Sequence, residues 1–330
     1  MKTPTTKRML VAVAAATCIV TAVRAGAADR DDQKGVRPCF DDAFTADPAP
    51  LAVGDTLYVY TGQDADDADG FKMPGWRLYS TKDMKTWKSH GIVASPDGNF
   101  TWGGKNTAWA SQCVGRNGKF YFYTTCIDKR KGWCMSIGVL VADRPEGPFK
   151  DPIGEPLIQH CQGDIDPTVF VDDNGQAWLY WGNPLLHTAK LNADMISIDK
   201  SYGDNGIKVV SERLKDYQEG PWVWKRDGKY YMAYASTCCP EGIGYSMSTS
   251  PEGPWEYKGH IMDHDIRSSG NHPGIVAFNG KWYCFGFGYQ RYHRLNPGEK
   301  HRERRSVCFA ELTYNPDGTI RQLPWWADIQ

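Results

Sequence analysis

The chain has 330 residues and a formal net charge of −1 at pH 7. A nearly neutral chain lacks the basic surface that nucleic acid or an anionic membrane attracts, so we expect neither as a partner. The aromatic content is high at 13%, with 13 tryptophans. Aromatic side chains serve sheet-to-sheet packing and also stack on sugars, so the excess suits a β-rich fold, a carbohydrate site, or both, with most tryptophans assigned to packing.

Residues 1–28 have the pattern of a secretory signal peptide. Lys2, Lys7 and Arg8 form a basic start, residues 9–20 form an apolar core, and small residues follow at the cleavage site. The apolar core is too short for a membrane span. The sequence therefore predicts a protein that is secreted or periplasmic.

The cysteines give little information about disulfide pairing or metal binding. Of ten in total, Cys18 lies in the signal peptide, which leaves nine in the mature chain. In an oxidising compartment several can pair, but an odd number leaves at least one thiol, and the pairing cannot be read from the sequence. Cys238 and Cys239 are adjacent, and no two pairs have the C-x-x-C spacing of a structural zinc site.

A hairpin motif repeats along the remaining chain. In its clearest copy, Asn174-Gly175 separates two β-branched and aromatic runs, which is a strong hairpin signal. Turn glycines followed by aromatic-rich strands recur at Gly54, Gly118, Gly175, Gly228 and Gly280, with spacings of 64, 57, 53 and 52 residues. A period near fifty with β-rich units is typical of a propeller. We therefore predict an all-β, five-bladed β-propeller as a single domain over residues 36–330, with a leader at 29–35.

In chain order, each blade has recognisable pieces. The acidic stretch at residues 63–74 follows the first hairpin strand, and we expect a solvated loop there, with a flap over the site as the alternative. The other expected pieces are an outer hairpin at 76–91, blade two from 101, blade three at 163–182, blade four from 217, blade five from 271, and a closing strand and turn at 304–312 and 315–320.

The residues that precede the turn glycines share a phase. Counting back 7 to 9 positions gives Asp47, Trp109, Asp166, Glu219 and His272. The first strand of each propeller blade lines the channel, so these side chains should converge at one end of the axis. Taken alone, each acid is explained as a turn or loop residue. Three acids at one offset in three of five repeats indicate a shared function instead.

Carboxylates gathered in one pocket suit glycoside hydrolysis. One protonated acid donates to the leaving oxygen, and one ionised carboxylate acts on the other face of the sugar ring. A third acid nearby would raise the proton affinity of the donor. With Asp47 and Glu219 facing each other from blades one and four, we expect a separation of roughly 6.5 to 9.5 Å and therefore inversion.

The motifs resemble glycoside hydrolase family 43 from residue 46 to residue 320. The resemblance is carried by ADPAP at 46–50, AWA at 108–110, DIDPTVFVDDNG at 164–175, EGP at 219–221, NHPGIV at 271–276 and RRSV at 304–307. Members of that family are five-bladed propellers that invert configuration while cleaving arabinose- and xylose-containing polysaccharides. By resemblance, Asp47 is the general base, Asp166 tunes the donor and orients the substrate, and Glu219 is the general acid.

The resemblance also implies roles around these acids. Arg305 would contact the substrate near the acid, with Arg304 as the competing choice, and Trp109 would stack on the sugar or simply pack. His272 would face a calcium ion or an ordered water in the channel, and a hydrogen-bonded core histidine is the alternative, because no ring of acidic ligands is visible beside it. No cofactor is required for the chemistry.

The expected activity is that of an exo-acting α-L-arabinofuranosidase, a monomer acting on a polysaccharide or oligosaccharide. A β-xylosidase and an endo-arabinanase are alternatives within the same chemistry. A fructan hydrolase would carry Asn-Asp-Pro, whereas Ala46 precedes Asp47 here. A non-catalytic sugar-binding propeller would not need all three acids.

Overall fold

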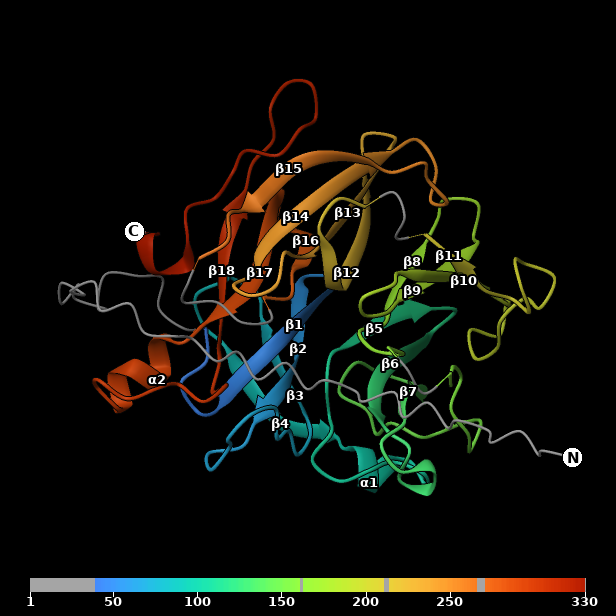
Figure 1. The fold of residues 1–330 in the computed structure, drawn as a ribbon, viewed down its shortest axis with the longest axis horizontal. Coiled ribbons are helices and arrows are strands. Elements are labelled where there is room, and N and C mark those ends of the chain that lie inside the picture. The colour runs from blue at the N-terminus through green and yellow to red at the C-terminus, as the bar shows by residue number, and fades with distance from the viewer. Residues whose placement is uncertain (1–38, 161–162, 211–213, 266–270, 330) are drawn as a thin grey trace, which may run out of the picture. The chain divides into compact units, whose positions relative to one another are not determined.

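Five antiparallel sheets follow one another along the chain in the computed structural model (Figure 1). The structure describes residues 39–160, 163–210, 214–265 and 271–329. The predicted signal peptide and leader lie outside these residues. Among the described residues, no helix has the length and apolar character needed to cross a bilayer.

Each sheet is a run of neighbouring strands, and the predicted five-bladed propeller is confirmed. The blades are β1 (Phe44–Val53), β2 (Thr56–Asp64), β3 (Trp76–Thr81) and β4 (Lys88–Ala94); β5 (Ser111–Arg116), β6 (Lys119–Ile127) and β7 (Met135–Ala142); β8 (Thr168–Val171), β9 (Ala177–Trp181), β10 (His187–Leu191) and β11 (Lys208–Val209); β12 (Tyr217–Arg226), β13 (Lys229–Ser236), β14 (Gly242–Ser248) and β15 (Glu256–Met262); β16 (Gly274–Phe278), β17 (Lys281–Gly288) and β18 (Ser306–Leu312). Short helices lie between or after them: α1 (Pro96–Asn99), η1 (Lys129–Lys131), α2 (Gln290–Leu295) and η3 (Trp326–Asp328).

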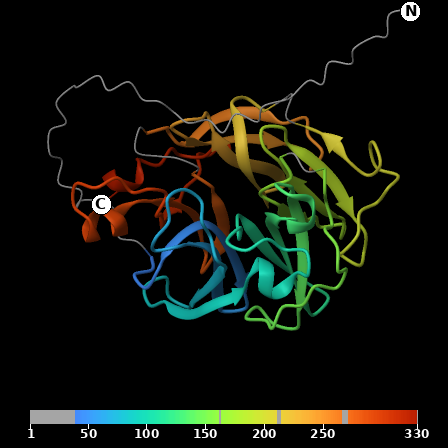
Figure 2. The ribbon, with the colours of Figure 1, turned by 60° about the horizontal axis from the view of Figure 1, so that its bottom comes forward.

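The first strand of every blade lies at the centre. β1 contacts β5 and β16, β8 contacts β5 and β12, and β12 contacts β16, so the five inner strands form a closed ring (Figure 2). This arrangement puts the residues at the start of each inner strand at one end of the axis.

The repeated turn glycine has a backbone cause. Gly118, Gly228 and Gly280 have φ of 73°, 74° and 75°, and the residue before each one also has positive φ. Two consecutive positive φ values define a type I′ turn, which matches the twist of the paired strands and favours Asn-Gly or Asp-Gly. In these three blades the repeated glycine therefore marks the type I′ turn of the first hairpin.

Aromatic side chains fill the space between blades. Nine of the 13 tryptophans are buried, which confirms that most serve packing. The largest fully buried side chains include four tryptophans and several tyrosines, among them Trp76, Trp102, Trp181, Trp326, Tyr60 and Tyr180. Trp133 is the opposite case, with 70% of its surface exposed.

The ring closes where the first blade meets the last. The backbone N–H of Cys39 donates to the carbonyl oxygen of Val307 at 2.8 Å, and the N–H of Thr45 donates to that of Arg305 at 3.0 Å. The chain at the start of β1 thus pairs with the chain at the start of β18. We call this contact the blade seam.

The cysteines divide between disulfides and buried thiols. Cys238 and Cys239 form a disulfide with each other, and Cys134 is also disulfide-bonded. Cys113 and Cys126 are buried thiols. Cys161 lies outside the described residues. The adjacent cysteines therefore carry a bond that spacing rules do not anticipate.

Candidate active site

Four of the predicted residues meet at one end of the axis, around His272. Its Nε2 lies 3.1 Å from Oε1 of Glu219 and 3.7 Å from Oδ2 of Asp166, and its Nδ1 lies 3.5 Å from Oδ1 of Asp47. Asp47, Asp166 and His272 are buried, and the side chain of Glu219 is 18% exposed. The predicted convergence of the three acids and the histidine is therefore present.

The backbone is specialised at each acid. Asp47 and Asp166 have φ of 52° and 61°, a left-handed conformation that aspartate tolerates better than most residues. Asp47 also lies at a shift in the β1–β2 register, and Glu219 lies between two shifts in the β12–β13 register. Such bulges turn side chains that regular pleating would aim elsewhere.

Gly220 is required by the same packing. Its φ is 58°, and a Cβ at this position would lie 2.9 Å from Cγ of His272. Its backbone N–H donates to Oδ2 of Asp166 at 3.1 Å. The glycine therefore lets His272 approach the backbone and ties Asp166 to the residue that follows Glu219.

Arg305 is held between two carboxylates. Its Nη1 donates to Oδ1 of Asp47 at 3.1 Å, and its Nε and Nη2 donate to Asp64 at 3.1 and 2.8 Å. The side chain of Arg305 is 3% exposed, and that of Asp64 is fully buried. The structure therefore places Arg305 against the predicted base, Asp47, whereas the resemblance implied a contact with the substrate near the acid. Arg304, the competing choice, donates to the carbonyl oxygen of Asp66 away from the acids.

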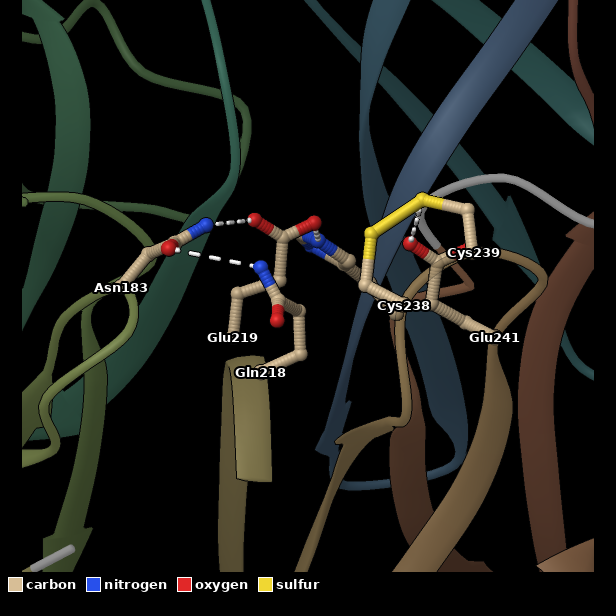
Figure 3. The surroundings of a disulfide bond; sticks show 7 residues. Asn183, Gln218, Glu219, Cys238, Cys239 and Glu241 are labelled. Atoms are coloured by element: carbon tan, nitrogen blue, oxygen red, sulfur yellow. Dashed lines mark hydrogen bonds and ion pairs between the residues drawn. A yellow bond between two sulfur atoms is a disulfide. The ribbon is translucent and has the colours of Figure 1, made fainter. Parts of the chain in front are cut away.

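Asn183 is a site residue that the sequence analysis missed, as is Asp64. The side-chain amide of Asn183 donates to Oε2 of Glu219 (Figure 3). It follows β9 by two residues, at the site end of blade three. Asp64 ends β2 within the acidic stretch, where its neighbours suggested solvent exposure. Neither carries the repeat phase that identified the other residues.

Burial and neighbouring charges shift the pKa values of the clustered groups in different directions. Burial alone would lower the pKa of His272, but the three carboxylates outweigh burial and raise it to about 10. Burial raises the pKa of Asp166 to about 7, against the opposing charge of His272. Burial would also raise the pKa of Glu219, but the hydrogen bond and charge of His272 lower it below its usual value.

This distribution differs from the expectation that neighbouring acids keep Glu219 protonated. The sequence argument counted the carboxylates and left out the imidazolium between them. These pKa shifts favour a protonated His272 and a partly protonated Asp166 near neutral pH, and they favour the ionised form of Glu219.

The charge on His272 predicts a pH dependence of folding. A histidine whose pKa is raised on folding contributes stability that is fully present below its unfolded pKa, about 6.5, and lost as the pH rises toward 10. From pH 7 to pH 9.5 the wild-type melting temperature should therefore fall more steeply than that of His272→Gln. His90→Gln is the control, since burial lowers the pKa of His90 and this histidine is neutral over that range. Equal slopes for wild type and His272→Gln would show that the ring is neutral.

Three aromatic residues, Phe71, Trp109 and Trp133, form an aromatic rim on one side of the site. Phe71 is 49% exposed, lies 5.1 Å from the Arg305 guanidinium, and accepts a hydrogen bond at its carbonyl oxygen from Nε1 of Trp109. The Trp109 ring lies 5.8 Å from that of Trp133. Trp109 is therefore on the rim and not within the acid cluster.

The acidic stretch at 63–74 is anchored beside the site near its two ends and is exposed between them, where Asp66, Asp67 and Asp69 form the expected solvated loop. Asp64 and Met73, near its two ends, are buried against Arg305. Charge density in the sequence concealed these anchoring contacts.

The channel cavity does not suit a His272-bound calcium. Calcium takes six to eight oxygen ligands, whereas both ring nitrogens of His272 face carboxylates. The axial cavity, of about 20 Å³, has room for one water, and Oδ1 of Asp166 and Oγ of Ser111 on its lining have no protein partner. This lining fits an ordered water.

The separation of the acids has an upper bound. The His272 ring bridges Asp47 and Glu219 through its two nitrogens, at 3.5 and 3.1 Å. Because the ring nitrogens are about 2 Å apart, the carboxylate oxygens that contact the ring are at most about 9 Å apart, so their separation does not exceed the roughly 9.5 Å limit for an acid pair that activates water.

Three acids around the axis of a five-bladed propeller, with an aromatic rim on one side of them, define a glycoside hydrolase. The family model described as glycosyl hydrolases family 43 matches residues 39–320. The chain belongs to glycosyl hydrolase family 43.

Known proteins of the family are similar over most of their length. A xylosidase/arabinosidase from Bacteroides ovatus is 29% identical over 322 residues, which cover 84% of this chain and 94% of that protein. A solved α-L-arabinofuranosidase from Clostridium thermocellum is 34% identical with a TM-score of 0.69, covering 86% of this chain and 94% of its own. A solved enzyme of the family from Xanthomonas citri, complexed with xylotriose, is 26% identical with a TM-score of 0.77, covering 89% and 95%.

Proposed function

We propose that this glycoside hydrolase is an exo-acting α-L-arabinofuranosidase that inverts the anomeric configuration. The observation that carries the proposal is the placement of Asp47 and Glu219 on either side of His272, with Arg305 holding Asp47. β-Xylosidase activity is the second candidate, since relatives of both kinds match this chain equally well.

In the proposed reaction, water attacks the anomeric carbon from the side of Asp47. Arg305 fixes the Asp47 carboxylate, which takes a proton from that water as the new C–O bond forms. The glycosidic C–O bond breaks on the other side, and Glu219 gives a proton to the leaving oxygen. Proton donation and acceptance balance, and the configuration inverts.

Glu219 must gain its proton before it can donate. Bound substrate would cover the exposed part of Glu219, and burial raises the proton affinity of a carboxylate. Nε2 of His272, 3.1 Å away, is placed to hand over a proton. The charge state of Asp166, the buried neighbour, then sets how readily Glu219 gains its proton.

The rim supports an exo-acting pocket. Phe71 and Trp109 form a wall on one side, joined by a hydrogen bond, and Asn183 stands beside Glu219 on the other. Walls from separate blades suit a pocket for one terminal sugar better than a groove for a continuing chain. Export, as residues 1–28 predict, would bring the enzyme to a substrate too large to enter a cell.

The test is hydrolysis of nitrophenyl α-L-arabinofuranoside and nitrophenyl β-D-xyloside, followed by proton NMR of the first-formed sugar. We expect faster release from the arabinofuranoside and a first product of inverted anomeric configuration. Faster release from the xyloside would favour the second candidate. First-formed sugar of unchanged configuration would exclude Asp47 as the base that activates water.

A further inference from the structure

The Cys238–Cys239 disulfide lies beside the acid cluster. Glu219 pairs with Ala235, Tyr217 pairs with Ser236, and Ser236 pairs with Gly242 across the sheet of blade four. The loop at residues 237–241 therefore leaves β13 at the site end of the blade. Asn183, Gln218 and Glu219 are among the surroundings of the disulfide (Figure 3).

Both cysteines are exposed, while the next acid along the loop is buried. Glu241 is 3% exposed, and one of its oxygens lies 3.3 Å from Sγ of Cys239. A disulfide sulfur carries no hydrogen, so this is a contact and not a donated hydrogen bond. The loop is thus anchored at Glu241 and presents two sulfurs to solvent.

A bonded pair of sulfurs is an unusual surface for a loop at a sugar site. Disulfide sulfur has weak acceptor capacity and high polarisability, so it behaves as an apolar contact surface. Adjacent cysteines joined in a small ring have no free side-chain rotation to lose when a ligand is bound. Pentose rings carry C–H groups that pair with such surfaces through dispersion.

We propose that the Cys238–Cys239 disulfide is a sugar-binding element. It contacts the C–H groups of the terminal pentose whose glycosidic oxygen reaches Glu219. The inference rests on the proposed function, because it takes a pentose as the ligand of this site. A disulfide that only constrains the loop would affect the stability of the protein and leave its affinity for the sugar unchanged.

The test compares wild type with Cys238→Ser/Cys239→Ser. For nitrophenyl α-L-arabinofuranoside we expect KM to rise roughly tenfold, equivalent to about 1.4 kcal/mol of binding, while kcat falls less than threefold. Calorimetric titration of L-arabinose into Asp47→Asn, with and without the two serines, should show the same loss without turnover. An unchanged KM together with an unchanged affinity for arabinose would overturn the proposal.

Reduction provides a second measurement that needs no substitution. Dithiothreitol gives two electrons and two protons to the disulfide and becomes its own cyclic disulfide, leaving two thiols. We expect it to raise the KM of wild type and to leave that of Cys238→Ser/Cys239→Ser unchanged. An equal response of both proteins would assign the effect to the disulfide of Cys134 and overturn the proposal.

The results distinguish a failure of the disulfide proposal from a failure of the proposed function. A wild-type enzyme that hydrolyses the arabinofuranoside, with variants of unchanged sugar affinity, contradicts only the role of the disulfide. A wild-type protein that neither hydrolyses nor binds either pentoside contradicts the proposed function, and the disulfide proposal fails with it.

Discussion

Asp47→Asn is expected to lower kcat by roughly 10²- to 10⁴-fold, the usual contribution of a general base. Asparagine has nearly the same shape and tolerates the left-handed φ of 52° at this position, so the fold should persist. The amide cannot take the proton of the attacking water. The melting temperature should fall, because the amide removes the charge that Asp47 presents to buried Arg305. Loss of turnover in a variant that keeps the wild-type circular dichroism spectrum would isolate the chemical role.

Asp55→Asn is the matched control for this variant. Asp55 follows β1 in the same blade and pairs with Lys82 on the surface, where its side chain is 76% exposed. Steady-state rates on an arabino-oligosaccharide should be unaltered in this control. If Asp47→Asn kept more than a tenth of the wild-type rate, Asp47 would not be the base.

Arg305→Met is expected to lower the free energy of unfolding by about 3 to 5 kcal/mol, the usual cost of removing one partner of a buried ion pair. Arg305 neutralises Asp47 and Asp64, and all three side chains are at least 95% buried. Methionine fills much of the volume but leaves two carboxylates without their cation. Activity should fall as well, because Asp47 loses the group that orients it.

Urea unfolding of Arg305→Met and Arg304→Met measures the difference. Arg304 is the neighbour in sequence, but it bonds to a surface carbonyl oxygen and stacks on Tyr292. Its replacement should cost less than about 1 kcal/mol, as surface substitutions usually do. Similar losses for the two variants would mean that the carboxylates around Arg305 are not charged in the folded protein.

The fold could be predicted because its signals are local. Three blades have a type I′ turn that favours glycine at a fixed place, as at Asn279-Gly280, and a glycine with positive φ marks the first hairpin of the other two, at Gly54 and Gly175. The acids were found because inner strands are equivalent by rotation, which keeps Asp47, Asp166 and Glu219 in phase.

The remaining site residues could not be predicted because their contacts are long-range. Asp64 reads as part of an acidic surface loop until Arg305, 241 residues away, is placed against it. Asn183 meets Glu219 only because blades three and four are adjacent. The charge on His272 depends on three carboxylates from three other blades, so no local pattern could reveal that it holds the proton expected on Glu219.

The blade seam links catalysis to the integrity of the ring. Arg305 belongs to the segment that pairs with Thr45, two residues before Asp47, and its guanidinium spans from the last blade to the first. Local openings in proteins occur at lower free energy than global unfolding. The first and last blades are joined at the blade seam by non-covalent contacts alone, so we expect the ring to open there first. Transient parting of the first and last blades would displace the general base while the other three blades stayed intact. Loss of catalysis should therefore precede loss of secondary structure, which makes turnover a sensitive gauge of ring opening.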